Sequence, residues 1–373
     1  MFKRIFVLFL ALCLVASADF SAKAQENITT GALSYVLMDG LTGDVLASKN
    51  IDKKLSMAST TKIMTALLLM EAGEPTASIS VTSRMVNVEG SNMGLRAGYT
   101  VKRSDLYYGL MLPSGNDAAN VTAYHMAGSL EGFSVMMNNK AKSIGMKNTN
   151  FVTPSGLDAN EHYTTAYDMA LLTRYALKNE TFKKVCSTYS IKLYYADGYH
   201  TLVNHNKMLK SYKGCIGVKT GYTSKSGRCL VTAAERDGQQ LICVTLNDYS
   251  DWDDHKRLLD YGFSLSRDKK ISFDIPQTAD VVGGCANAVR LRADPCVVRV
   301  FDGQQNNVTY KIKIDPIIYS PIDIGQRVGY IDIYIKGELY TKRSIIALTG
   351  SDYAVLYRKK KSIFECLKEI FSY

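Results

Sequence analysis

The segment LSMASTTKIMTALLLMEAG, residues 55–73, carries Ser59 three residues before Lys62. On a helix, residues at i and i+3 lie on the same face. The continuous apolar run over residues 63–70 predicts that this helix is buried. We therefore expect a hydroxyl and an amine side by side at the start of a buried helix, and this arrangement suggests chemistry.

A serine hydroxyl is a weak nucleophile unless a base removes its proton. Lys62 can act as that base only as a neutral amine, and the unperturbed pKa of lysine is about 10.4. Burial, a nearby second cation and the positive end of a helix each lower this pKa. The pattern alone is weak, since Ser266 and Lys269 repeat it in a hydrophilic segment.

Two further motifs strengthen the interpretation. Ser114 and Asn116 form a Ser-x-Asn pair just after a proline, and Lys219-Thr220-Gly221 lies at the edge of a predicted strand. The ordered set Ser-x-x-Lys, Ser-x-Asn and Lys-Thr-Gly is the one found in penicillin-recognising serine enzymes. Type, order and spacing agree together, so the sequence predicts a catalytic site.

The residue types suit acyl transfer. Ser59 would attack a carbonyl and hold an acyl ester, and Lys62 would accept its proton. Ser114 could pass the proton to the leaving amine, and Asn116 could orient Lys62 or a substrate amide.

The third motif suits recognition. Lys219 and Thr220 offer a cation and a hydroxyl to a substrate carboxylate. Gly221 lets a substrate backbone run close along the strand. Backbone N–H groups would stabilise the oxyanion.

Three longer segments carry a family resemblance: EGSNMGLRAGYTVKRSDLYYGLMLPSGNDAAN (89–120), IGMKNTNFVTPSGLDANEHYTTAYDMALL (144–172) and GVKTGYTSKSGRCLVTAA (217–234). Together with the motifs they resemble the D-alanyl-D-alanine carboxypeptidases, the low-molecular-mass penicillin-binding proteins, over about residues 30–265. The resemblance implies an α+β transpeptidase-like domain, an antiparallel sheet with helices on both faces. It also implies removal of the terminal D-alanine from peptidoglycan stem pentapeptides without a cofactor, and covalent inhibition by β-lactams.

By position, the resemblance assigns the acyl-forming serine, its base, a second catalytic serine and a carboxylate-binding lysine to Ser59, Lys62, Ser114 and Lys219. It assigns the two oxyanion N–H groups to Ser59 and Tyr222. Tyr222 and Ser155 depart from the family pattern, because histidine is frequent among relatives at both places; this leaves the pH dependence and the deacylation rate open.

Two other functions remain as alternatives. A β-lactamase would need a glutamate-activated water, but Cys243 stands where a Glu-x-x-Leu-Asn motif ending at Asn247 would place its acid. A wall protein that binds or senses penicillin and turns over slowly would carry the same motifs. Asp117 is interpreted as a helix cap, and the five histidines as core or surface residues.

The first residues, 1–24, are typical of a signal peptide. Lys3 and Arg4 precede an apolar run over residues 5–15, and small residues allow cleavage after Ala18 or Ala24. We therefore expect export, with the protein at the outer face of a bacterial cytoplasmic membrane or in the cell wall.

Hydrophobic periodicity predicts the elements around the motifs. Residues 31–50 indicate two strands, and residues 227–247 a hairpin around an Asp-Gly turn. Helices should dominate from 57 to 185, one of them capped by Ser104 and interrupted by Pro113. A further helix is expected over residues 253–265.

The predicted catalytic domain covers residues 25–268, and an all-β domain follows over 269–350. Period-two alternation over 308–314 and 331–335, with a turn at Lys336-Gly337, favours a small sandwich. Residues 351–373 form a basic amphipathic tail that is too short to span a bilayer and suits an interfacial membrane anchor.

Charge and cysteine content limit the partners. The formal net charge of +10 fits a wall polymer or a membrane face better than nucleic acid, since no basic run is interleaved with aromatic residues. No Cys/His spacing indicates a metal site. Cys285 and Cys296 flank a short polar segment and could pair, whereas Cys215, Cys229 and Cys243 read as core residues.

Overall fold

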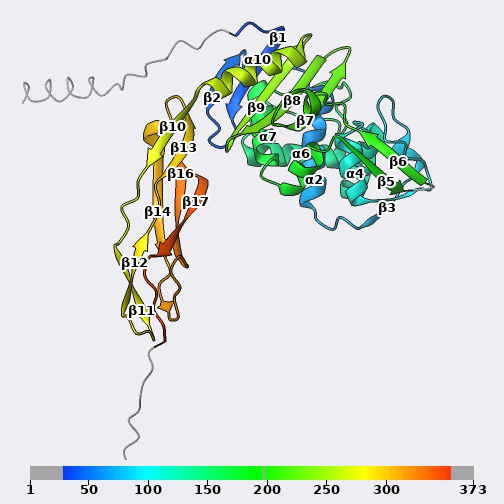
Figure 1. Ribbon diagram of the computed structural model, residues 1–373. Helices are drawn as coiled ribbons and strands as arrows, with labels where there is room; N and C mark the ends of the chain where they lie inside the picture. The colour runs from blue at the N-terminus through cyan, green and yellow to red at the C-terminus, as the bar shows by residue number, and fades with distance from the viewer. Residues whose placement is uncertain (1–27, 196–197, 354–373) are drawn as a thin grey trace, which may run out of the picture. The chain divides into compact units, whose positions relative to one another are not determined.

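A computed structural model describes residues 28–195 and 198–353 (Figure 1). The chain divides into two compact units, the first ending at Ser264 and the second starting at Leu265, with residues 237–239 grouped with the second. The predicted signal peptide and all but the first three residues of the predicted tail lie outside the described residues.

The first unit is built on a five-stranded antiparallel sheet. In spatial order its strands are β2 (Val45–Lys49), β1 (Ala32–Asp39), β9 (Gln239–Asp248), β8 (Gly227–Arg236) and β7 (Cys215–Thr223). The predicted β1–β2 and β8–β9 hairpins are both confirmed. β7, which carries the Lys-Thr-Gly motif, is an edge strand.

Alternate side chains of β1 serve the two faces of this sheet. Val36 and Met38 belong to the large apolar core shared with most of the helices. Leu37 points to α10 (Asp251–Ser264), where Gly262 packs so closely that an added Cβ would lie 2.9 Å from it. Both faces are therefore apolar, and Figure 1 shows α10 on one face and the helical cluster on the other. This confirms the expected layering.

The helical cluster surrounds α2 (Lys62–Glu71), whose residues 62–70 are all buried. Its larger partners are α4 (Arg103–Met111), α5 (Asn116–Ala127), α6 (Leu130–Ile144), α7 (Ala166–Ala176) and α8 (Glu180–Cys186). Short elements complete the unit: η1 (Ala58–Thr61), α3 (Ser83–Val86), α9 (Met208–Ser211) and the hairpins β3 (Ser78–Ser80)–β4 (Thr100–Lys102) and β5 (Ser190–Tyr195)–β6 (Gly198–Val203).

Ser104 does not cap α4, so that prediction is wrong. The helix begins at Arg103, directly after β4, and Lys102 is its N-cap residue. The backbone N–H groups of Arg103 and Ser104 donate to the carbonyl oxygens of Ala77 and Pro75, each at 2.9 Å. The neighbouring segment therefore satisfies helix-start donors that a serine side chain would otherwise serve. The break at Pro113, between α4 and α5, is confirmed.

The second unit is rich in β structure, as expected. Its main sheet has the order β14 (Val308–Ile314), β16 (Arg327–Ile335), β17 (Glu338–Ala347), β12 (Ala288–Arg292), β11 (Thr278–Val282) and β15 (Ile318–Tyr319). A separate pair joins β10 (Ser266–Ile271) to β13 (Cys296–Phe301), and η2 (Gln305–Asn307) precedes β14. The alternation along β14 and the turn after β16 are confirmed.

Cys285 and Cys296 do not pair, so the tentative disulfide is wrong. Both are free thiols. The thiol of Cys285 lies 3.1 Å from the carbonyl oxygen of Tyr353, whereas Cys296 is buried in β13, opposite Ile271. Cys229 and Cys243 are buried in the first unit, as expected. Within residues 28–195 and 198–353, no helix is long and apolar enough to cross a membrane.

Candidate active site

Ser59 lies in the 3-10 turn η1, which runs directly into α2. The preceding residue, Ala58, has φ of 46°, an unusual left-handed conformation for a residue with a Cβ. The edge strand β7 passes so close that a Cβ on Gly221 would lie 3.0 Å from the Ser59 nitrogen. Gly221 therefore allows the strand and the serine turn to meet.

Lys62 is completely buried behind this turn. Its Nζ lies 2.9 Å from Ser59 Oγ, 2.7 Å from Asn116 Oδ1 and 2.6 Å from the carbonyl oxygen of Ser155. A neutral amine has two N–H groups and one lone pair. It can donate to the two carbonyl-type oxygens and accept from the Ser59 hydroxyl, so all three contacts suit the unprotonated form.

The surroundings of Lys62 favour the same form. Burial, above all, and the charge of Lys219 hold the pKa of Lys62 well below its ordinary value, against a smaller opposing effect of Asp117. Desolvation and like-charge repulsion thus both favour the neutral amine.

Asn116 starts α5 and joins two parts of the site. Its Oδ1 accepts from Lys62, and its Nδ2 donates to the carbonyl oxygen of Glu89 at 2.7 Å. Ser114, two residues earlier, has φ of 63°. Its Oγ is buried and has no hydrogen-bond partner among the described residues. This hydroxyl faces the cleft with its donor and acceptor unused.

A cleft of about 330 Å³ opens over these groups. Five of the predicted site residues line it, namely Ser59, Ser114, Thr220, Gly221 and Tyr222. Six others that sequence reasoning missed complete its lining: Ser91, His205, Lys207, Arg228, Asp251 and Trp252. Lys62 and Asn116 lie behind the lining and are joined to it through Ser59.

Lys219 is 1% exposed and is not among the lining residues. Its ammonium donates to the carbonyl oxygen of Thr220 at 3.0 Å, and burial lowers its pKa to about 7. The structure therefore places this charge beneath the floor of the cleft, where it acts on Lys62.

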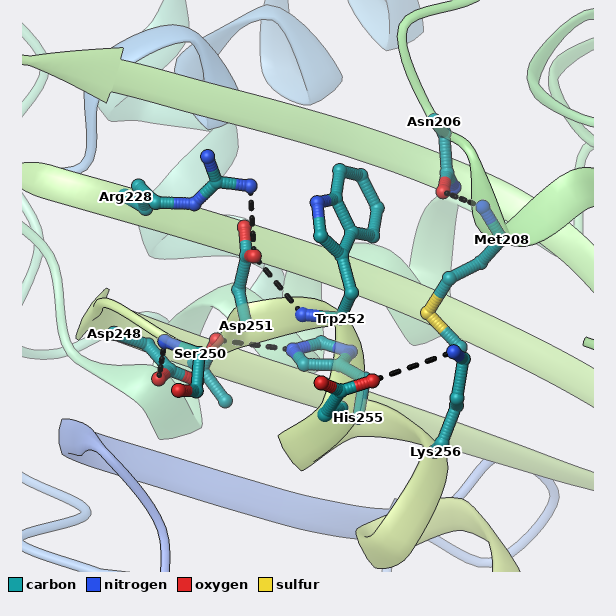
Figure 2. Close-up of polar contacts among 11 residues, drawn as sticks. Asn206, Met208, Arg228, Asp248, Ser250, Asp251, Trp252, His255 and Lys256 are labelled. Carbon is teal, nitrogen blue, oxygen red and sulfur yellow. Dashed lines mark hydrogen bonds and ion pairs between the residues drawn. The ribbon is translucent and has the colours of Figure 1, made fainter. Parts of the chain in front are cut away.

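Arg228 supplies a permanent positive charge at the cleft (Figure 2). It lies opposite Tyr222 in the β7–β8 pairing. Its guanidinium donates at 2.8 Å to Asp251, which is 3% exposed and also accepts the backbone N–H of Trp252 at 2.9 Å. Asp251 thereby holds the arginine from the start of α10. No local sequence pattern predicts this pair, because 23 residues separate its members.

Asp117 does not cap its helix, since Gly115 is the N-cap residue of α5. The buried carboxylate accepts three backbone N–H groups from a neighbouring loop, those of Met93, Gly94 and Leu95, at 2.9–3.0 Å. It fixes the loop that carries Ser91 to the cleft. Among the residues described, no cluster of three or more His, Cys, Asp or Glu could hold a metal ion.

Comparisons with known proteins agree with this site. Residues 20–250 match the family model of the peptidase S11 D-alanyl-D-alanine carboxypeptidases. The chain is 32% identical to the D-alanyl-D-alanine carboxypeptidase DacF of Bacillus subtilis, covering 89% of each protein. It is 33% identical to DacC of Escherichia coli over 90% of this chain and 88% of that protein. A crystal structure of penicillin-binding protein 5 from Haemophilus influenzae superposes with a TM-score of 0.62, at 27% identity over 87% of this chain and 98% of that one.

The chain belongs to the peptidase S11 family of D-alanyl-D-alanine carboxypeptidases. It is a serine-type carboxypeptidase that acts on the D-Ala-D-Ala ends of peptidoglycan peptides, and the predicted enzyme class is confirmed.

Proposed function

We propose that Ser59 is the nucleophile of this carboxypeptidase and Lys62 its general base. The position of Lys62 Nζ carries the proposal: it is fully buried, 2.9 Å from Ser59 Oγ and directed at two further oxygens. An ammonium could donate to all three oxygens, but the lowered pKa of Lys62 favours the neutral amine, whose lone pair can take the serine proton. Its lowered pKa lets Lys62 act as a base closer to neutral pH than an ordinary lysine.

The reaction then follows from the geometry. Ser59 Oγ attacks the carbonyl carbon of the penultimate D-alanine while its proton passes to Lys62. The N–H groups of Ser59 and Tyr222 stabilise the oxyanion. Collapse breaks the peptide bond, and Ser114 Oγ, whose hydrogen-bonding capacity is unused, relays the proton to the leaving D-alanine amine. Water then hydrolyses the acyl ester.

The free carboxylate of the terminal D-alanine binds, in this proposal, at the floor and the β8 side of the cleft. Thr220 offers a hydroxyl there and Gly221 lets the peptide run beside β7. Lys219 contributes its charge from beneath the floor, and Arg228 contributes a guanidinium at the cleft itself. Charge-assisted hydrogen bonds of this kind are the strong ones.

Mass spectrometry of the intact protein and of its proteolytic peptides tests the assignment. Penicillin should add its mass to one peptide, the one holding Ser59, and Ser59→Ala should remain unlabelled. Labelling that survives in Ser59→Ala would remove the assignment. Following the label and a D-Ala-D-Ala pentapeptide over time separates a turning-over carboxypeptidase from a protein that is acylated and stays so.

We further propose that the protein is exported and held at the outer face of the cytoplasmic membrane by residues 351–373. The support is sequence alone: the basic run 358–361 followed by apolar residues at helical spacing. Flotation with anionic vesicles should carry the mature protein, whereas a version ending at Tyr357 should stay behind. Equal flotation of the two would contradict an anchor.

A further inference from the structure

His162 is a buried histidine that the acyl-transfer mechanism does not use, yet it is connected to the nucleophile turn. It is 5% exposed and comes from the segment between α6 and α7. One ring nitrogen, Nε2, lies 2.9 Å from Thr61 Oγ1. Thr61 lies between Ser59 and Lys62 in the sequence, in the turn η1.

The tautomer of His162 follows from its other contacts. Nδ1 accepts the backbone N–H of Val152 at 2.9 Å, so the ring proton is on Nε2. Nε2 must therefore donate to the Thr61 hydroxyl. That hydroxyl in turn donates to the carbonyl oxygen of Ala58 at 2.8 Å. Nδ1 also lies 3.4 Å from the backbone N–H of Thr153, so both contacts assign it as the acceptor.

This chain of hydrogen bonds ends at the peptide group between Ala58 and Ser59. In a trans peptide the C=O and the N–H point in opposite directions, so fixing one fixes the other. The carbonyl of Ala58 and the N–H of Ser59 belong to the same peptide. Because Ala58 has the unfavourable φ of 46°, this peptide needs external support to keep its orientation.

We propose that His162 is a positioning residue: through the hydroxyl of Thr61 it fixes the peptide whose N–H, that of Ser59, is an oxyanion donor. This rests on the proposed function, in which Ser59 is the nucleophile and supplies that N–H. Burial lowers the pKa of His162 to about 4, so the imidazole stays neutral and keeps this donor arrangement at neutral pH.

The same segment supports the turn at two more points. Gly156 packs directly on the Ala58 carbonyl, where an added Cβ would lie 1.9 Å from the oxygen. The carbonyl of Ser155 accepts from Lys62. The segment that carries His162 thus contacts both the oxyanion peptide and the base.

Thr61→Val and Thr61→Ser form the first test. Valine keeps the shape of threonine and loses the hydroxyl, whereas serine keeps the hydroxyl. We expect acylation by a β-lactam to fall roughly 10- to 100-fold in Thr61→Val, because a misplaced oxyanion donor weakens transition-state binding. Thr61→Ser should stay within about threefold of the native rate. KM for a peptide substrate should change little, while kcat and the affinity for a boronic acid that mimics the tetrahedral adduct should fall together.

His255 provides the matched control for His162. His255 is buried as well, and its Nδ1 and Nε2 lie 2.7 Å and 3.0 Å from the hydroxyls of Thr232 and Thr245. It belongs to α10, which packs on the sheet. His162→Leu and His255→Leu should both lower the melting temperature. Only His162→Leu should slow acylation, measured where circular dichroism shows both variants folded, and adding Thr61→Val to it should cause little further loss.

Acylation in Thr61→Val equal to that in Thr61→Ser would overturn the proposal, as would equal slowing in the two histidine variants. The proposed function is tested separately in the native protein. If the β-lactam label is not on Ser59, the nucleophile assignment fails; if it is and Thr61→Val acylates normally, only the role of His162 fails.

Discussion

Two sides of the site, the buried wall and the open wall, differ in how they hold a basic side chain. The buried wall consists of Ser59, which lines the cleft, with Lys62 and Asn116 behind it, and its lysine is fully enclosed with a pKa well below the ordinary value. The open wall consists of Arg228, Asp251 and Trp252, and the side chain of its arginine is 43% exposed. A base must lose its proton, so it needs burial, whereas a guanidinium stays charged even when buried and can stand in the open.

In the proposed function this contrast separates the chemistry, at the buried wall, from substrate recognition, at the open wall. On the buried wall the Nζ atom of Lys62 already has three hydrogen-bond partners before substrate binds. On the open wall Asp251 uses part of the guanidinium and leaves other N–H groups for a ligand. Substitutions on the buried wall should therefore affect kcat, and those on the open wall KM.

Lys62 should give the largest effect. Lys62→Met is close to isosteric but leaves Asn116 Oδ1 and the Ser155 carbonyl oxygen without the Lys62 donor, so the melting temperature should fall by a few degrees at most. Acylation by a β-lactam should fall roughly 10²- to 10⁴-fold, the usual contribution of a general base. Stopped-flow acylation and thermal denaturation measure the two changes.

Lys62→Arg is the matched variant, because its guanidinium stays protonated near neutral pH and cannot accept the serine proton. It should be as slow as Lys62→Met. Acylation within about threefold of the native rate in either variant would remove the general-base role and erase the distinction between the walls.

The buried wall was largely predictable from sequence, and the open wall was not. Ser59 and Lys62 lie one helical turn apart, so local periodicity placed them, and the motif set added Asn116 and Lys219. Arg228 and Asp251 meet only because β8 and α10 pack together. Likewise, no local pattern links Thr61 to His162, 101 residues away. Contacts made by tertiary packing leave no periodic trace in the sequence.

The layers of the fold were predictable for the same reason. Alternation and helical spacing report which residues are buried, and they indicated the hairpins and the buried helix α2. They could not show that carbonyl groups of a neighbouring segment would satisfy the first N–H groups of α4 in place of a Ser104 cap. Nor could they show that Asp117 would bind the backbone of a distant loop. Both depend on which segment packs alongside.

Arg228 should give the next largest effect. Arg228→Gln removes the exposed charge, and we expect KM for a D-Ala-D-Ala peptide to rise roughly 10-fold, with kcat changed less. Amidating the terminal carboxylate of the peptide should raise KM far more for the native enzyme than for the Arg228→Gln variant. Arg292→Gln, a surface arginine paired with Asp294 in the second unit, is the control and should leave KM unchanged. Equal penalties for amidation in native and variant enzyme would count against the contact.

Lys219 links the two walls through pH. Acylation needs neutral Lys62, so its rate rises with pH through the pKa of Lys62 and then levels off. Lys219, with a pKa lowered to about 7, is charged on the acid side and disfavours a second ammonium nearby. Lys219→Met removes that repulsion, so the pKa of Lys62 should rise and the acid limb of the profile should move to higher pH.

The pH dependence of the second-order acylation rate measures this shift independently of any overall loss of rate. A limb that stays in place would show that burial alone sets the pKa of Lys62, and a limb that moves to lower pH would contradict the repulsion by Lys219. Lys219 should also make the stability of the native protein depend on pH. The free energy of unfolding should rise with pH above about 7, because Lys219 in the unfolded chain keeps a proton that the folded residue has lost.

Trp252 should give the smallest effect. Its ring centroid lies 5.7 Å from the Arg228 guanidinium, and a cation–π contact at a partly exposed site contributes about 0.5–1 kcal/mol. Trp252→Leu should therefore raise KM only about two- to fivefold, while Trp252→Phe should preserve most of the contact. Trp252 is the single tryptophan of the chain and lines the cleft, so its fluorescence should change when a β-lactam or peptide binds. In Arg228→Gln the same fluorescence change should need more peptide but reach the same amplitude. If Trp252→Leu raises KM as much as Arg228→Gln does, the ring itself binds substrate, and the open wall recognises more than charge.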